Sequence, residues 1–343
     1  MNSPLPAALP PAVLPGWRRP EPLTVVLLLL AFVWLSLSTY VMVPDRLGVA
    51  HRWLLLPAIP AVIAVHVLLL RMFSRSTVAV VGITMVMLWI LVAAAAPYLP
   101  LLDPNRPVAP YQMPFTTKNG MTFWLGTDMR GRDILSRTLW GSQRVLVWGI
   151  TATFSAYVVG AFLGLVAGYL GGWWDEALSF LGNMVLSFPV MILLILVLNY
   201  LGQSGFNIII AVTCSSAPAI MRIVRGLAMD ARGRDYIQAA QTRGESVVWI
   251  MLIEILPNVR GPLIVDACLR LGYTTVMITT LTFLGLGLQP PDPDWGLMIK
   301  EAASSALLWK FAYMIIVPSI AVSTLILGFN LLADGLRELS QKD

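Results

Sequence analysis

Long apolar runs alternate with short polar stretches along most of this chain of 343 residues. A run of about 18 or more apolar residues lets a helix cross a hydrocarbon core of roughly 30 Å, where the backbone must satisfy its own hydrogen bonds. We therefore expect an all-α polytopic membrane protein. The pattern predicts eight membrane-spanning helices, at residues 23–43, 53–70, 78–98, 145–170, 177–200, 206–224, 262–284 and 311–333.

The second run is the weakest of the eight. Pro57 and Pro60 interrupt it, and its length gives only about 27 Å of helix, so the sequence leaves open whether it crosses fully. With the first run it would form a hairpin, residues 23–73. The preceding tail, residues 1–22, is rich in Pro and Ala, and we expect it to be disordered and cytoplasmic.

A polar stretch, residues 235–258, separates the sixth and seventh apolar runs. Asp235 is placed to cap the start of a helix, with Gln238 three residues later as its reciprocal partner. Gly244 suits the left-handed residue that ends such a helix. The spacing therefore predicts one short helix that begins at Asp235 and ends before Gly244.

A second short helix is predicted in the same stretch, over residues 247–256. Ser246 is placed to cap it and Pro257 to stop it, and it is apolar on every face. One side can therefore lie on the membrane bundle while another meets a partner. Because Ala239 and Ala240 are small, another backbone can approach the first helix closely. We call residues 235–258 the docking segment.

Several residues inside the apolar runs predict special packing. Three glycines, at positions 160, 164 and 168, would form one flat stripe for close helix contact. The fifth run is expected to kink at Phe188 and Pro189. In the seventh run, Asp266 and Arg270 stand four residues apart, and each charge alone would cost roughly 2.5 to 3.5 kcal/mol at mid-membrane. They form either a structural ion pair or the lining of a solute path.

Two polar connections are expected at the end of the bundle opposite the docking segment. Residues 99–143 begin with many prolines and continue into a turn and a short amphipathic helix at the membrane interface. Residues 297–308 are also amphipathic and predict a second interfacial helix.

Composition agrees with a membrane protein. Hydrophobic residues make up 57% of the chain and charged residues 12%, with a mean hydropathy of +0.77, which excludes an ordinary soluble domain. The net charge is +5, but the basic residues cluster beside the spans, so we attribute it to membrane topology and not to nucleic-acid binding. Cys214 and Cys268 fall within apolar runs and support neither a disulfide nor a metal site.

The sequence contains no set of residues that is typical of a catalytic site. It contains no Gly-x-x-x-x-Gly-Lys-Ser/Thr phosphate loop, no nucleophile elbow and only two histidines. We therefore predict that the chain is not an enzyme by itself and binds no cofactor.

The docking segment resembles the EAA loop of bacterial ABC importer permeases, the segment that fits a cleft on the ATPase subunit. In that family the loop reads Glu-Ala-Ala, three residues, Gly, and then Ile-Leu-Pro, with the Pro thirteen residues after the Gly. Gln238 replaces the family's Glu and keeps a polar group of the same length. The resemblance assigns ATPase coupling to Asp235, Gln238, Ala239, Ala240, Arg243, Gly244, Ile255, Leu256 and Pro257.

Three further stretches resemble the dipeptide and oligopeptide branch of this family, which includes nickel permeases. They are Leu-Gly-Thr-Asp at 125–128, Phe-Leu-Gly-Leu-Gly at 283–287 and Asp-Gly-Leu-Arg at 334–337. The resemblance covers roughly residues 78–337 and implies a six-span core. The chain would then divide into the tail, an extra hairpin at 23–73 and a permease domain at 74–343.

What the resemblance implies is a pore subunit in the bacterial inner membrane, with both termini cytoplasmic. Its expected partners are a related second permease, two cytoplasmic ATPases that use ATP and Mg²⁺, and an extracytoplasmic solute-binding protein. Lys and Arg residues favour this orientation only narrowly, twelve to ten. The expected function is import of dipeptides, oligopeptides or a similar small solute.

Two alternatives remain from the sequence. Permeases for nickel, a metal chelate or glutathione are similar in this family. A secondary transporter driven by an ion gradient would need intramembrane carboxylates and inverted repeats, and we find only Asp266 and Glu254, with no repeat. The neighbouring reading frames would distinguish the two classes. The sequence identifies neither the solute nor the pore-lining residues.

Overall fold

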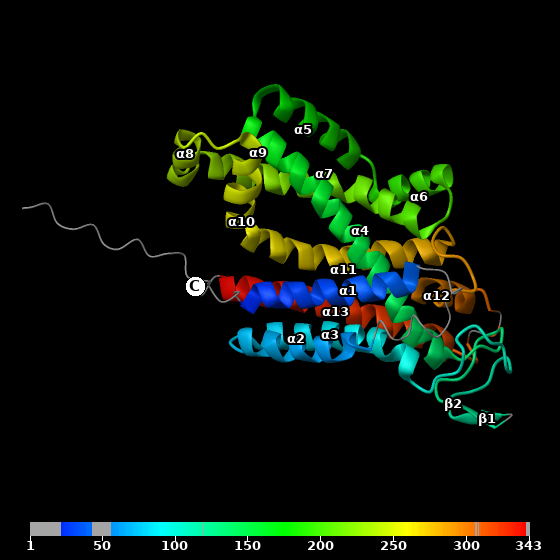
Figure 1. The fold of residues 1–343 in the computed structure, drawn as a ribbon. Coiled ribbons are helices and arrows are strands. Elements are labelled where there is room, and N and C mark those ends of the chain that lie inside the picture. The colour runs from blue at the N-terminus through cyan, green and yellow to red at the C-terminus, as the bar shows by residue number, and fades with distance from the viewer. Residues whose placement is uncertain (1–21, 43–55, 119, 306, 308, 341–343) are drawn as a thin grey trace, which may run out of the picture.

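The computed structural model describes residues 22–42, 56–118, 120–305, 307 and 309–340, and helices dominate these residues (Figure 1). The predicted tail lies outside them, apart from Pro22. In chain order the elements are α1 (Pro22–Met42), α2 (Ala58–Met72), α3 (Thr77–Ala95), the 3-10 turn η2 (Ala96–Tyr98), β1 (Thr116–Lys118), β2 (Met121–Phe123), α4 (Ile134–Leu170), α5 (Gly172–Leu186), α6 (Val190–Leu201), α7 (Gly205–Arg232), α8 (Asp235–Thr242), α9 (Val247–Trp249), the π-helix η3 (Ile250–Ile255), α10 (Leu256–Asn258), α11 (Arg260–Leu284), α12 (Trp295–Ala303) and α13 (Tyr313–Ser340).

Five helices of the described chain are long and apolar enough to cross a membrane: α3 with η2, α4, α7, α11 and α13. The pair α5 and α6 makes a sixth candidate, bent by 92° at its break. A kink was expected at Phe188 and Pro189, but the bend is sharp enough to separate two helices. The 15 residues of α2 form a shorter apolar helix, in keeping with the weak second run. The fold is therefore an all-α polytopic membrane protein, as predicted.

Helix α4 is longer than the sequence suggested. We expected a separate interfacial helix before a span at 145–170, but one helix of 37 residues begins at Ile134. Asp133 caps it by accepting a hydrogen bond from the Ser136 backbone N–H at 2.8 Å. No proline follows within the helix, so nothing in the chain ends the first turns before the apolar run starts. At 1.5 Å per residue, α4 extends about 55 Å, beyond the hydrocarbon core.

Helix α12 was predicted as an interfacial helix over 297–308, but it spans Trp295–Ala303 and packs inside the fold. Asp294 caps it by accepting from the Leu297 N–H at 3.0 Å, which places the start two residues earlier. The Trp295 side chain is fully buried, and its Nε1–H donates to the Thr138 carbonyl at 2.8 Å. A small hairpin, β1 and β2, was not predicted, since its strands have only three residues each.

Helices α4 and α7 meet through the predicted glycine stripe. An added Cβ at Gly160 would lie 2.7 Å from the Ile220 Cβ, and one at Gly164 would lie 2.6 Å from the Met221 carbonyl oxygen. At Gly168 the carbonyl of Arg225 would be 2.5 Å away. No side chain fits these three positions without separating the helices, so α4 and α7 pack backbone to backbone.

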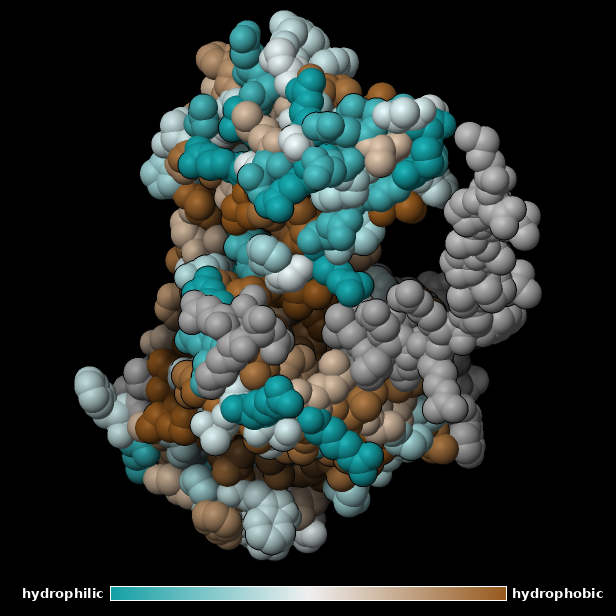
Figure 2. Space-filling model, turned by 90° about the vertical axis from the view of Figure 1, so that its left-hand side faces the viewer, coloured by the Kyte–Doolittle hydropathy of each residue, from teal (hydrophilic) through white to brown (hydrophobic). Residues whose placement is uncertain are grey.

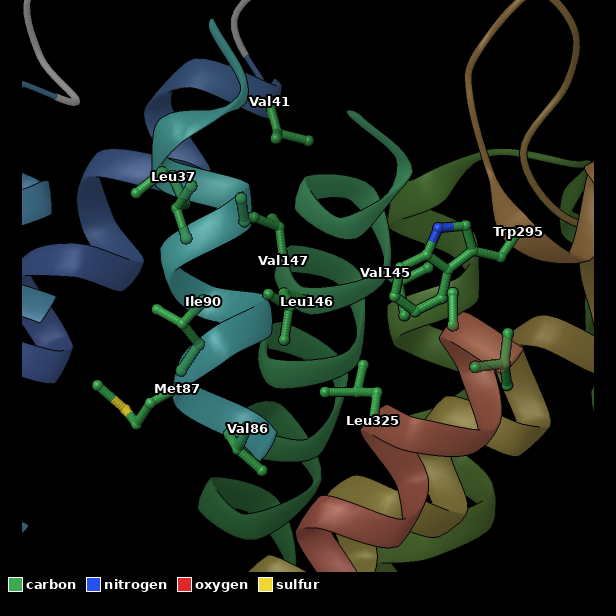
Figure 3. Packing of buried hydrophobic residues seen from close by; sticks show 14 of the residues in the cluster. Leu37, Val41, Val86, Met87, Ile90, Val145, Leu146, Val147, Trp295 and Leu325 are labelled. Atoms are coloured by element: carbon green, nitrogen blue, oxygen red, sulfur yellow. The ribbon is translucent and has the colours of Figure 1, made fainter. Parts of the chain in front are cut away.

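The largest apolar cluster joins the N-terminal helices to the rest of the bundle (Figure 3). Leu37 of α1 lies near Ile90 of α3 and Val147 of α4, and Leu325 of α13 belongs to the same cluster (Figure 3). At one end of the bundle, the Ser76 hydroxyl before α3 donates to Glu338 near the end of α13 at 2.6 Å. The predicted hairpin therefore packs on the core.

The bundle has two distinct ends (Figure 1). Helices α8 to α10 lie at the same end as the end of α13, and we call this the docking end. The β1–β2 hairpin and α12 lie at the opposite end, which we call the hairpin end (Figure 1). The docking segment therefore sits where α7 finishes and α11 begins.

Candidate functional site: the docking segment

The start of α8 differs from the prediction. The capping residue is Arg234, whose side chain makes no capping hydrogen bond, and Asp235 is the first residue of the helix. The Arg234 carbonyl already accepts from the Ile237 N–H at 3.0 Å and the Gln238 N–H at 3.3 Å. Asp235 therefore does not cap through its side chain. Its carboxylate in the first turn still favours the helix through the helix dipole.

The end of α8 follows the prediction. Gly244 has a φ of +78°, in the left-handed region. The Glu245 N–H donates to the Ala240 carbonyl at 3.2 Å, and the Gly244 N–H donates to the Gln241 carbonyl at 2.9 Å. This pair of bonds is a Schellman motif, which satisfies the last carbonyls of the helix and turns the chain sharply.

The second helix begins as predicted but ends later. The Ser246 hydroxyl accepts from the Trp249 N–H at 3.3 Å, which confirms the cap. The helix then widens into the π-helix η3 and continues through Pro257 to Asn258. Pro257 does not stop it, because it occupies the first turn of α10, where the missing N–H is not needed.

Burial divides the predicted coupling residues into two groups. Ala240 and Ile255 are fully buried, together with Ile237, and Leu256 is half-buried. The exposed group comprises Asp235, Gln238, Ala239, Arg243, Gly244 and Pro257. The segment therefore has an anchoring side and an open side.

The anchoring side packs against three membrane helices. Ile237, Ala240 and Ile255 share one apolar cluster with residues of α4, α7 and α11. The Gln241 amide also donates to the Tyr169 hydroxyl of α4 at 3.1 Å. These contacts attach the segment to helices on both sides of it in the chain.

The open side carries large apolar side chains that sequence reasoning did not single out. The exposed fraction of Val248 is 57%, that of Trp249 48% and that of Ile253 51%. The signal was present in the sequence, because a short helix that is apolar on every face cannot bury all of them. Exposed apolar side chains beside polar ones are typical of a protein contact surface.

Arg243 connects the end of α8 to the π-helix η3 on the open side. Its guanidinium lies 3.1 Å from Glu254 and 3.6 Å from Glu245, so it bridges the end of α8 and the π-helix. The Arg243 side chain is 55% exposed, so this contact contributes at most about 1 kcal/mol. It orients the surface more than it stabilises the fold.

Viewed from the docking end, hydrophilic side chains gather over the upper half of the molecule, on the side of α5 and α8 (Figure 2). The segment η3–α10 runs from this region to the start of α11 (Figure 1). The docking segment is thus a solvent-facing connection between the α4–α7 pair and α11.

The two charged residues predicted within the seventh span lie together. The Arg270 Nε is 2.6 Å from the Asp266 Oδ2, and the Tyr157 hydroxyl of α4 donates to the same oxygen. About a fifth of each charged side chain is exposed, 18% for Arg270 and 22% for Asp266.

Among the described residues, no group of three or more His, Cys, Asp or Glu side chains could hold a metal ion. A polytopic helical bundle with a solvent-facing docking segment between two spans defines the class: a multi-pass membrane protein with an exposed surface of short helices at one end.

The comparison with known families specifies this class. Residues 160–343 match the family described as binding-protein-dependent transport system inner membrane component, and the chain belongs to it. It is 35% identical over 279 residues to a glutathione transport system permease protein, GsiD, of Pectobacterium atrosepticum, covering 78% of this chain and 88% of that protein. The Escherichia coli protein of the same name is 36% identical over 270 residues, covering 78% and 87%.

The chain is therefore a permease of a bacterial ABC importer of the dipeptide and oligopeptide type. It is a multi-pass inner-membrane protein, and its family is the permease component of the importer and not the ATPase.

Proposed function

We propose that the docking segment is the surface through which a cytoplasmic ATPase drives this permease. The observation that carries the proposal is the division of adjacent residues: Ala240 is fully buried against the bundle while Ala239 faces solvent. A segment anchored on one side and open on the other can receive a force and pass it on.

Two rigid connections would transmit that force. Through α8, a push reaches α7, and α4 follows because the glycine stripe leaves no space between the two helices. Through α10, the same push reaches α11, which begins at Arg260. Opposed movement of α4–α7 and α11 would switch the bundle between inward-facing and outward-facing states.

The assembly that this role requires has four kinds of subunit. Two ATPases bind ATP and Mg²⁺, a related second permease completes the pore, and an extracytoplasmic binding protein delivers the solute. In this arrangement the docking end and both termini are cytoplasmic, and the hairpin end is external.

The solute we propose is a short peptide, with glutathione as the first candidate. Support comes from the two relatives named as glutathione transport permeases, which align with 78% of this chain. Glutathione is itself a tripeptide, so it fits the peptide class that the external motifs suggested.

The test is a charge placed on the open side. Ala239→Glu should reduce solute uptake by at least about tenfold in vesicles carrying the complete transporter, because the new carboxylate would be buried unpaired at the ATPase contact. ATP hydrolysis should then no longer respond to loaded binding protein. Ala240→Glu is a poorer test, since that position is buried and the variant would misfold.

Gln238→Glu is the matched control. It adds the same charge one residue away, at an exposed position where the family's loop carries Glu, and uptake should stay unchanged. Equal uptake by Ala239→Glu and the wild type would disprove the coupling role.

A further inference from the structure

The Asp266–Arg270 ion pair lies within the candidate membrane span α11, where burying a charge costs free energy. Asp266 lies six residues, about 9 Å, from the start of this candidate span, and Arg270 lies one turn deeper. Charged side chains within spans are rare and face the bundle interior or a water-filled path, where they commonly act in transport.

The pair is not a closed contact within one helix. The Tyr157 hydroxyl reaches it from α4 and donates to the Asp266 carboxylate. The three groups therefore combine one cation, one anion and one hydroxyl from two helices. These are the two helices that the proposed coupling would move relative to each other.

The surface around the pair remains partly open. About a fifth of the Asp266 and Arg270 side chains is exposed, and Tyr273 on the same face of α11 is 59% exposed. Because residues 266, 270 and 273 follow a spacing of four and three, they share one helix face. Hydrocarbon would not cover a partly open ion pair, so this face meets protein or water in the assembled transporter.

We infer that Tyr157, Asp266 and Arg270 form a binding site on the solute path, which contacts the charged ends of a short peptide. Arg270 would take the peptide's carboxylate and Asp266 its ammonium group. When no solute is present, the two side chains satisfy each other. This inference rests on the proposed peptide solute, because a bare metal cation would be repelled by Arg270.

The first test measures whether water reaches the face of α11 that carries Asp266, Arg270 and Tyr273. In a chain with Cys214→Ser and Cys268→Ser, Tyr273→Cys should react with a water-soluble maleimide in vesicles that hold the complete transporter. Leu327→Cys on α13, 49% exposed on an apolar helix, is the control and should not react. Adding S-methylglutathione together with the binding protein should slow the reaction of the Tyr273→Cys variant with the maleimide at least about threefold. No reaction, or reaction without protection, would overturn the inference.

The second test measures transport. Asp266→Asn and Arg270→Gln should each lower uptake of S-methylglutathione or dialanine at least about tenfold, while loaded binding protein still stimulates ATP hydrolysis. Thr275→Val, buried on the opposite face of α11, should leave uptake unchanged. The double variant Asp266→Arg with Arg270→Asp keeps an ion pair but misplaces both charges.

The double variant distinguishes a solute-binding role of the ion pair from a purely structural one. Full recovery of uptake would mean that the pair is only structural and would overturn the inference; continued loss in a protein that is inserted and assembled supports it. A wrong solute assignment gives a different result, because the wild type itself would then fail to import either peptide.

Discussion

The two ends of this bundle use charge in opposite ways. At the hairpin end, the Arg132 side chain is 4% exposed, lies 2.6 Å from Asp128 and also pairs with Glu301 of α12. At the docking end, Arg243 is 55% exposed and its partners are also partly in solvent. The Arg132 side chain is therefore paired inside the protein, whereas the Arg243 side chain is paired at a surface that still faces solvent.

One tryptophan from each end shows the same contrast. Trp295 at the hairpin end is fully buried, and burial also raises the pKa of the adjacent Asp294 carboxyl. Trp249 at the docking end is 48% exposed. The Trp295 side chain is therefore part of a packed interior, whereas the Trp249 side chain lies on an open surface.

The largest effect is expected from truncating the two tryptophans. Trp295→Ala should lower the free energy of unfolding by about 3–5 kcal/mol, because it leaves a large cavity and removes the indole hydrogen bond to the Thr138 carbonyl. Trp249→Ala should cost less than about 1 kcal/mol but reduce stimulation of the ATPase. Thermal unfolding of both purified variants checks the first contrast. Similar losses at the two positions would contradict the comparison of the ends.

A smaller effect is expected from the buried charge cluster. Arg132→Gln should destabilise the protein by about 3 kcal/mol, because Asp128 would lose its side-chain cation and Glu301 would keep only the exposed Arg130. Arg130→Gln is the control: this side chain is 55% exposed, and its loss should cost about 0–1 kcal/mol. The measurement is again the unfolding midpoint, and a larger loss for Arg130→Gln would show that the cluster is assigned wrongly.

The smallest effect concerns the docking segment's cap. Ser246→Ala should weaken the second helix by about 1 kcal/mol, since it removes the acceptor for the Trp249 N–H. Hydrogen exchange should rise over residues 247–250 and not at the hairpin end. Ser246→Asp retains a capping oxygen and should behave like the wild type. Unchanged exchange in Ser246→Ala would mean that tertiary contacts alone hold this helix.

Features controlled by a few neighbouring residues could be predicted from the sequence. Gly244 takes its left-handed conformation and Ser246 its cap because both depend on local backbone hydrogen bonds. The glycine stripe of α4 was predictable for the same reason, since a four-residue spacing alone places the glycines on one face. Asp235 failed as a cap because the backbone of Arg234 provided the helix start first.

Features that depend on distant partners could not be predicted. The burial of α12 is set by contacts between segments far apart in the chain, such as Trp295 with Thr138. In the docking segment, the sequence grouped Ala239 with Ala240, and only packing against α4, α7 and α11 separates the exposed residue from the buried one.

By itself, the sequence determined that this chain crosses a membrane many times and carries a polar segment of short helices between two spans, because hydropathy and helix ends are local properties. Tertiary structure alone decided which side of that segment faces outward, and that Tyr157 of α4 meets Asp266 of α11. Burial and pairing require surfaces from separate helices, and no local pattern of residues records which surfaces will meet.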